Sequence, residues 1–412
     1  MSNTKPQPKR GTPDFQLLIL TLLLVGFGLI MVFSSSSSLA VISERWGYDP
    51  LYFTKRQLAF AILGTFVMLV AMNINFKKYK KLFFPVFFIT LILLILVVVI
   101  GKATNGAASW FNLGKYGIQP TELAKIATIV YLSALITKKG ERIRQWKGGF
   151  FPVLIIVGVV AGLIMLQPDL GSTFILVATS GLVIYAGGAS IKHITACISL
   201  VALGLALTIG IGSLFDAVSG GETRQAGSSN YKVGRIEAYL DPFADQAGTG
   251  YNLVQSLIAI GQGGVTGAGY GESVQKLHYL PNPYNDFIFS VIAEEFGFIG
   301  TTIFLLLYLY FIWRGIIVSL RCPDPFGTLT GIGIMGLIAI QAFINIGGVT
   351  NTIPITGVTL PFISYGGSSL LVMMLAMGIM LSISRESNRP TQEEKVKSVV
   401  RKTSYNVPGR RP

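Results

Sequence analysis

The chain has 412 residues, of which 51% are hydrophobic and 13% are charged, and its net charge is +14. Soluble domains carry about 25% charged residues, so a chain this poor in charge cannot cover a water-exposed surface, and a soluble fold is excluded. The positive charge would suit nucleic acid, but the basic residues lie in short loops between apolar segments, which favours a membrane protein.

Ten segments are apolar over close to the roughly 20 residues that a helix needs to cross a bilayer. We therefore expect an all-α polytopic membrane protein with about ten transmembrane helices. The first segment is too long for the apolar part of a signal peptide and is interpreted as an uncleaved anchor. The predicted spans are 15–33, 57–73, 82–101, 120–137, 150–166, 171–188, 191–213, 286–313, 327–348 and 359–384.

The basic residues predict which side of the membrane each loop occupies. Most of the 33 Lys and Arg residues lie in the two termini and in alternate loops, including clusters at 77–81 and 138–147. Cytoplasmic loops carry an excess of Lys and Arg, so both termini are expected in the cytoplasm. The large loop 214–285, between the seventh and eighth spans, then lies outside the cell, and no nucleic acid is needed to explain the charge.

The predicted organisation is one membrane domain with short polar ends. Residues 1–14 form a cytoplasmic N-terminus, and residues 15–384 form a single transmembrane domain. Residues 385–412 form a basic cytoplasmic tail that can touch anionic headgroups.

Four polar segments fall on the predicted outer face, and the first leads into the fourth span. It contains Trp110, Gln119 and a helix start at Pro120. Glu122 and Lys125 are three residues apart and so share a helix face. Charges inside a span are costly unless they are paired or line a wet cavity. A structural ion pair and a substrate-binding role are both open, while Trp110 suits an interfacial belt.

The second segment is a tight turn at Asp169, which can cap the following helix or contact a substrate. The third is the large outer loop, which carries Gln255, Ser256 and a run of glycines between Gly261 and Gly271. The glycines do not form a nucleotide-binding motif and follow no predicted strand, so a nucleotide fold is rejected. Re-entrant or amphipathic helices with glycine turns are expected in this loop.

The large loop ends at Asp286, at the outer boundary of the eighth span. Glu294 and Glu295 follow at about 80° and about 180° round the helix from Asp286. Asp286 can simply cap the helix, or it can act as a general base whose pKa is tuned by partial burial.

The fourth segment interrupts the last span at Pro361 and at the Gly366–Gly367 pair. Ser364, Tyr365 and Ser368 lie in this interruption. Such breaks line cavities in membrane proteins, although a simple kink is the alternative.

At these segments the sequence resembles the SEDS family (shape, elongation, division and sporulation) of FtsW/RodA/SpoVE-type proteins, over roughly residues 14 to 385. Together its motifs are specific, whereas each alone would be weak. The motifs are Gln119–Glu122, Gln167–Ser172, Leu280–Pro281, Asp286–Phe289, Ala293–Glu295 and Leu360–Ser368.

The resemblance implies a peptidoglycan glycosyltransferase that polymerises lipid II at the outer leaflet of the bacterial cytoplasmic membrane during division or sporulation. It also implies a class B penicillin-binding protein as the transpeptidase partner, with other divisome or sporulation membrane proteins. Asp286 matches the family's essential carboxylate and is expected to take the proton of the acceptor hydroxyl. Substrate-binding residues are expected at Trp110, Gln119, Glu122, Lys125, Asp169, Gln255, Ser256, Lys276, Ser364, Tyr365 and Ser368.

The leaving pyrophosphate requires positive charge, to which a divalent cation, Mg²⁺ or Mn²⁺, would contribute. Two departures from the family pattern argue against a pyrophosphate site beside Trp110 and against a strong metal site at Asp286. Ala107–Ser109 precede Trp110 where many relatives carry a basic residue, and Asn282 stands where relatives often carry an acid. The basic candidates for the pyrophosphate are Lys125, Arg224, Lys232, Arg235 and Lys276.

A flippase or transporter for a lipid-linked sugar is the main alternative. Ten spans, a broken helix and the intramembrane Glu122 and Lys125 would suit alternating access. The lack of visible inverted repeats and the polar motifs gathered on one face argue against it. A non-catalytic scaffold is a third class, and substitution of Asp286 distinguishes the three.

Overall fold

The computed structural model describes residues 11–104, 107–113, 116–197, 199, 238–245, 248 and 250–388. Short 3-10 turns occur at Glu44–Trp46 and Gly140–Arg144, and a π turn at Trp146–Phe150. The helices are α1 Phe15–Val41, α2 Tyr52–Asn73, α3 Phe76–Ile100, α4 Pro120–Lys139, α5 Phe151–Met165, α6 Leu170–Ala186, α9 Tyr251–Gln262, α10 Ile288–Leu320, α11 Pro325–Val349 and α12 Gly367–Ser387.

Seven helical stretches in the described part of the chain are long and apolar enough to cross a membrane, and α6 is a shorter apolar helix. The polytopic helical fold is therefore confirmed. Nine of the ten predicted spans coincide with helices among the described residues, with α4 accounting for the fourth. The seventh predicted span, 191–213, lies mostly outside the described residues, so the count of ten stays a prediction.

Several helices extend beyond their predicted spans, as α2 does by beginning at Tyr52, α3 by beginning at Phe76 and α10 by ending at Leu320. α1 also continues past its predicted end to Val41, and within this extension Ser35 and Ser36 donate their hydroxyls to carbonyls of the same helix, Ser36 to that of Val32 at 2.6 Å. α12 begins at Gly367 rather than at Thr359, because the apolar residues before it are held in a non-helical segment.

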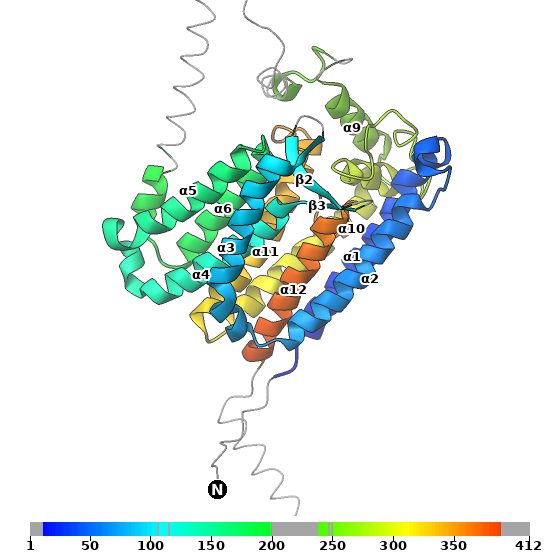
Figure 1. Ribbon diagram of the computed structural model, residues 1–412. Coiled ribbons are helices and arrows are strands. Elements are labelled where there is room, and N and C mark those ends of the chain that lie inside the picture. The colour runs from blue at the N-terminus through cyan, green and yellow to red at the C-terminus, as the bar shows by residue number, and fades with distance from the viewer. Residues whose placement is uncertain are drawn as a thin grey trace, which may run out of the picture.

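The helices form a bundle with a buried centre (Figure 1). α1 and α2 run side by side along one edge, and α3 to α6 gather at the other, with α10, α11 and α12 between them. In α11 and α12, 72% and 78% of the most apolar stretch of each helix is buried, whereas in α3 only 22% is buried. α11 and α12 are therefore the central helices, and α3 presents most of its surface to lipid.

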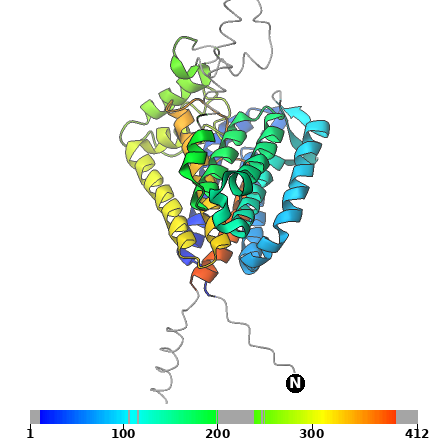
Figure 2. The same ribbon diagram turned by 90° about the vertical axis from the view of Figure 1, so that its left-hand side faces the viewer.

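The two ends of the described chain lie together at one end of the bundle. The Arg385 guanidinium donates to the Gly11 carbonyl at 3.1 Å, and the Asn388 amide donates to the Thr12 carbonyl at 3.1 Å. In both views α9 lies at the opposite end of the bundle (Figures 1 and 2). Both ends of the membrane domain are therefore on the same side.

A small antiparallel sheet joins α3 to α4, at the same end as α9 (Figure 1). The sequence did not predict it, because two of its three strands are only three residues long. Gly117 allows the Trp110 ring to lie across the next strand, since a Cβ there would be 2.9 Å from Trp110 Cε3. The strands are β1 Lys102–Thr104, β2 Ala107–Leu113 and β3 Tyr116–Ile118.

α10 is broken at Gly297, whose φ of 62° and ψ of −166° are not helical. The break frees carbonyls before it and amides after it, and lipid offers no partner for either. Residues 264–269 of the loop between α9 and α10 insert at this point and complete the hydrogen bonding. The four bonds are Ala268 N to Glu294 O (2.9 Å), Gly269 N to Glu295 O (3.0 Å), Phe298 N to Gly264 O (2.9 Å) and Ile299 N to Val265 O (3.1 Å).

Glycines are required where the inserted segment meets α10. A Cβ on Gly263 would lie 2.1 Å from the Ala293 carbonyl oxygen, and one on Gly267 would lie 2.2 Å from the Glu295 carbonyl oxygen. On the helix side, a Cβ on Gly297 would lie 2.2 Å from Gly267 N. The glycines therefore allow the two backbones to approach closely, in addition to forming turns.

We predict that Gly267→Ala destabilises the protein far more than Gly271→Ala. Both glycines have a φ near 85°, but a Cβ on Gly271 meets nothing within 4 Å. Gly271→Ala should lower the free energy of unfolding by about 1 kcal/mol through backbone strain alone, and Gly267→Ala by about 3 kcal/mol or more through the added clash. Thermal unfolding in detergent measures both, and equal melting temperatures would contradict the close-approach interpretation.

Candidate active site

Asp286 lies in the turn before α10, with its side chain half-buried. It borders a small recess between the start of α10, the C-terminal end of α11 and residues 355–358. Asn345 and Thr356 line the same recess. The carboxylate thus sits where the loop before α10 meets the helical bundle, at the residue for which the sequence predicts a general base.

Asn345 of α11 fixes the backbone of the Asp286 turn. Its amide nitrogen donates to the carbonyls of Asp286 and Val358, at 2.7 Å in each case, and the side chain is 3% exposed. Its Oδ1 has no hydrogen-bond partner among the described residues. Asn345 therefore joins α10 to the segment before α12 and leaves one buried acceptor at the recess.

Gln341 lies one turn before Asn345 and shares its helix face. Its Oε1 accepts from Lys125 Nζ at 3.1 Å, and its Nε2 donates to the Thr359 carbonyl at 3.1 Å. The side-chain amides of Gln341 and Asn345 therefore connect one face of α11 both to the charged pair of α4 and to the Asp286 turn.

Glu122 and Lys125 form the ion pair that their spacing predicts. Lys125 Nζ lies 2.8 Å from Glu122 Oε1; Lys125 is 1% exposed and Glu122 is 5% exposed. Ser369 of α12 donates to the other Glu122 oxygen at 3.5 Å. Because both charges are paired inside the bundle, this contact ties α4 to α11 and α12 and leaves no free ammonium.

Asp169 caps α6, as its position before that helix predicts, by accepting from Ser172 N at 2.9 Å. Gln119, the residue before α4, donates its side-chain amide to the other Asp169 oxygen at 3.4 Å. The starts of α4 and α6 are therefore joined at the end of the bundle that carries the small sheet (Figure 1). Trp110 lies on β2, half-buried.

The non-helical segment before α12 is clamped by Gln57 of α2. Gln57 donates to the Ser364 carbonyl and accepts from Gly366 N, both at 3.2 Å. The Ser364 hydroxyl accepts from Leu360 N at 2.8 Å, which closes the turn. Ser368, at the start of α12, is 7% exposed, and its hydroxyl has no partner within the described residues.

Tyr365 joins this segment to the Asp286 turn. Its backbone amide donates to the Tyr284 carbonyl at 2.9 Å, and the rings of Tyr284, Tyr365 and Phe53 pack together. Burial raises the pKa of Tyr284 to about 12. The phenol therefore stays a neutral hydrogen-bond donor two residues before Asp286.

The remaining predicted residues do not gather at the recess. Ser256 of α9 contacts the Ser290 hydroxyl at 2.6 Å and donates to the Val349 carbonyl at 2.7 Å, so it fastens α9 to the bundle. Gln255 is half-buried on the same helix. Lys276 is paired with Glu295 at 2.8 Å, in a separate cluster. The three other basic candidates, Arg224, Lys232 and Arg235, lie outside the described residues.

Sequence reasoning missed Gln57, Gln341 and Asn345. The last two carry a usable signal, since amides at i and i+4 inside the apolar span 327–348 must find partners within the bundle.

No group of three His, Cys, Asp or Glu side chains suited to a metal occurs in the part of the chain that the structure describes.

The fold and this site define a multi-pass membrane protein with a polar site at one end of its bundle. The family model for FtsW, RodA and SpoVE, described as cell cycle protein, matches residues 15–389. The chain therefore belongs to the FtsW/RodA/SpoVE family. It is a multi-pass protein of the cytoplasmic membrane.

Two relatives match almost the whole chain. Stage V sporulation protein E of Bacillus subtilis is 42% identical over 382 residues, which cover 92% of this chain and 99% of the relative. A probable peptidoglycan glycosyltransferase FtsW of Geobacter metallireducens is 38% identical over 373 residues, covering 90% of this chain and 94% of that protein.

Two solved structures share the fold. A chain from a peptidoglycan synthase complex that coordinates polymerization and crosslinking has a TM-score of 0.73 at 27% identity, and the match covers 92% of this chain and 99% of that chain. The Thermus thermophilus rod shape determining protein RodA has a TM-score of 0.64 at 26% identity, with 92% and 98% covered.

We predict that Lys125→Met destabilises the protein by about 3–5 kcal/mol, because it leaves the Glu122 carboxylate buried without its counter-charge. The double substitution Lys125→Met/Glu122→Gln should recover most of that loss. The exposed pair Lys55–Asp49 supplies the control, and Lys55→Met should leave the melting temperature unchanged. A double variant no more stable than Lys125→Met, measured by thermal unfolding in detergent, would contradict this account.

Proposed function

We propose that this chain is a peptidoglycan glycosyltransferase that polymerises lipid II, with Asp286 as the general base. The observation that carries the proposal is the half-buried Asp286 carboxylate at the recess, on a turn fixed by Asn345. The names of its relatives support the activity. The outer leaflet and a role in division or sporulation are parts of the same proposal.

In the proposed reaction, Asp286 takes the proton from the 4-hydroxyl of the acceptor sugar. The hydroxyl oxygen forms a bond to the anomeric carbon of the donor lipid, while the bond from that carbon to the pyrophosphate oxygen breaks. Undecaprenyl pyrophosphate leaves with the electron pair of the broken bond. The protein supplies position and charge stabilisation, and no covalent enzyme intermediate is required.

The site must then also stabilise the negative charge of the leaving pyrophosphate. Lys125 and Lys276 are both buried and paired with glutamates, which argues against a direct role for either ammonium. Arg56 is a candidate within the described region, because it lies at the outer end of α2 beside Gln57, with its guanidinium 4.3 Å from the Tyr52 ring centre. A Mg²⁺ or Mn²⁺ ion held mainly by the pyrophosphate oxygens would supply further positive charge.

The proposed partner is a class B penicillin-binding protein acting as the transpeptidase, together with other membrane proteins of division or sporulation. A relative of the same fold occurs in a peptidoglycan synthase complex, which supports a synthase partner for this chain.

We predict that Asp286→Asn abolishes glycan-strand formation from purified lipid II while the protein stays folded. General-base catalysis contributes 100-fold or more, so the rate should fall by at least about 100-fold. Asp49→Asn provides a matched control, because Asp49 lies in the exposed turn between α1 and α2 and pairs with Lys55. Its rate should equal that of the wild type, with and without the transpeptidase partner.

Each other outcome of this experiment has a defined meaning. Equal polymer from Asp286→Asn and wild type would remove Asp286 from the mechanism. An absence of polymer from the wild type, even with its partner, would favour a lipid-linked sugar flippase, for which transport into liposomes is then measured.

We also propose that both termini lie in the cytoplasm and predict that a membrane-impermeant maleimide labels Glu44→Cys but not Glu141→Cys in intact cells. Both glutamates are exposed and lie in short 3-10 turns, at positions that the charge distribution assigns to opposite sides. The background carries Cys197→Ser and Cys322→Ser. Permeabilised cells, in which both sites should label, control for reactivity, and labelling of Glu141→Cys alone in intact cells would invert the orientation.

A further inference from the structure

We propose that the buried Lys276–Glu295 pair, together with Ser34, positions Asp286 by anchoring the half-helix that follows it. This inference rests on the proposed function of Asp286. It assigns Lys276 a positioning role in place of direct contact with the pyrophosphate.

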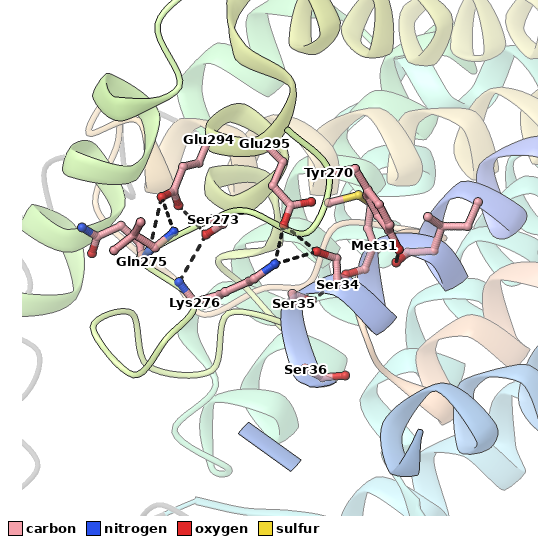
Figure 3. Close-up of polar contacts among 12 residues, drawn as sticks. Met31, Ser34, Ser35, Ser36, Tyr270, Ser273, Gln275, Lys276, Glu294 and Glu295 are labelled. Atoms are coloured by element: carbon pink, nitrogen blue, oxygen red, sulfur yellow. Dashed lines mark hydrogen bonds and ion pairs between the residues drawn. The ribbon is translucent and has the colours of Figure 1, made fainter. Parts of the chain in front are cut away.

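Three polar side chains from three parts of the chain meet inside the bundle (Figure 3). Lys276 Nζ lies 2.8 Å from Glu295 Oε1 and donates to Ser34 Oγ at 3.0 Å. The Ser34 hydroxyl donates to the same Glu295 oxygen at 2.5 Å. Ser34 comes from α1, Lys276 from the outer loop and Glu295 from α10, so this triad joins all three.

The neighbouring Glu294 fastens the same loop from the other side of the helix. Its Oε2 accepts from the Ser273 hydroxyl at 2.5 Å, and its Oε1 accepts from Val274 N at 2.7 Å and Gln275 N at 3.2 Å (Figure 3). Glu294 therefore fixes residues 273–275 of the loop. This places the next residue, Lys276, beside Glu295.

The break at Gly297 makes these anchors decisive for Asp286. Residues 288–296 form a half-helix about 14 Å long at 1.5 Å per residue, and the backbone ladder does not continue past Gly297. Asp286 lies just before one end of this half-helix and Glu295 lies near the other. The half-helix is therefore held by Asn345 at the Asp286 end. At the Glu295 end it is held by the Lys276–Glu295–Ser34 triad, together with Glu294 and the backbone bonds to residues 264–269.

The burial of the triad argues against a substrate contact. Lys276, Glu295 and Ser34 are 4%, 1% and 3% exposed. Glu295 Oε2 has no hydrogen-bond partner among the described residues, so the carboxylate depends on Lys276 and Ser34 for its stabilisation. Removing Lys276 alone strands a buried charge, and the expected consequence is displacement of the half-helix.

The first test compares Ser34→Ala with Ser36→Ala in the full chain, using the rate of lipid II polymerisation. Ser36 lies on the same helix, but its hydroxyl donates only to its own helix, at the Val32 carbonyl. We expect Ser34→Ala to lower kcat about fivefold with an unchanged KM for lipid II, and Ser36→Ala to match the wild type. Equal kcat in the two variants, at equal melting temperatures, would overturn the proposal.

The second test separates positioning from direct binding by comparing Lys276→Met, Glu295→Gln and the double variant. A positioning pair predicts loss of kcat in each single variant and recovery of at least a tenth of wild-type kcat in the double, because no uncompensated charge remains. A pyrophosphate ligand predicts instead that Glu295→Gln stays active and that the double variant shows the raised KM of Lys276→Met, which would overturn the proposal. Should a single variant fail to fold, the double variant and Ser34→Ala decide the question.

These results are distinct from failure of the proposed function itself. If the wild type forms no polymer, the glycosyltransferase proposal fails and no variant is informative about positioning. If the wild type is active and Asp286→Asn is inactive, the kcat values of the triad variants report on positioning alone.

Discussion

Every backbone polar group that a broken membrane helix releases must find a partner inside the protein, because lipid offers none. In this chain that requirement is met at Gly297 by residues 264–269, which take the place of the missing helical turn. The same contact folds the loop between α9 and α10 back onto α10 and brings Lys276 to Glu295. The placement of the carboxylate at Asp286 thus depends on how a defect in one helix is repaired by a loop that precedes it in the chain.

The second constraint is the pairing of charge within the bundle. Both buried lysines that sequence reasoning offered for the pyrophosphate are neutralised by glutamates, Lys125 by Glu122 and Lys276 by Glu295. A buried cation that already has a close counter-charge gains little from a second anion, and reaching it would require the substrate to enter the bundle. The role that the structure supports for both lysines is to connect separate segments of the bundle.

Sequence patterns predicted the features that depend on near neighbours. The Glu122–Lys125 pair follows from a spacing of three residues, and the cap of α6 follows from Asp169 standing directly before that helix. Features that depend on distant partners were missed or misplaced. Residues 359–366 are largely apolar and read as helix, yet Gln57, some 300 positions away, holds them in a turn. Asn345 and Gln341 were overlooked for the same reason, since their partners lie on other elements of the fold.

The contact between the two ends of the membrane domain has a consequence for how the chain can be rearranged. Arg385 and Asn388 reach back to the carbonyls of Gly11 and Thr12, so the first and last helices begin and end within one hydrogen bond of each other. A short linker between residues 388 and 11 would close the chain with little distortion. New termini opened at an exposed turn such as the one between α1 and α2 would then give a circular permutant with the same bundle, in which both ends emerge at the end of the bundle opposite to the present ones (Figure 1).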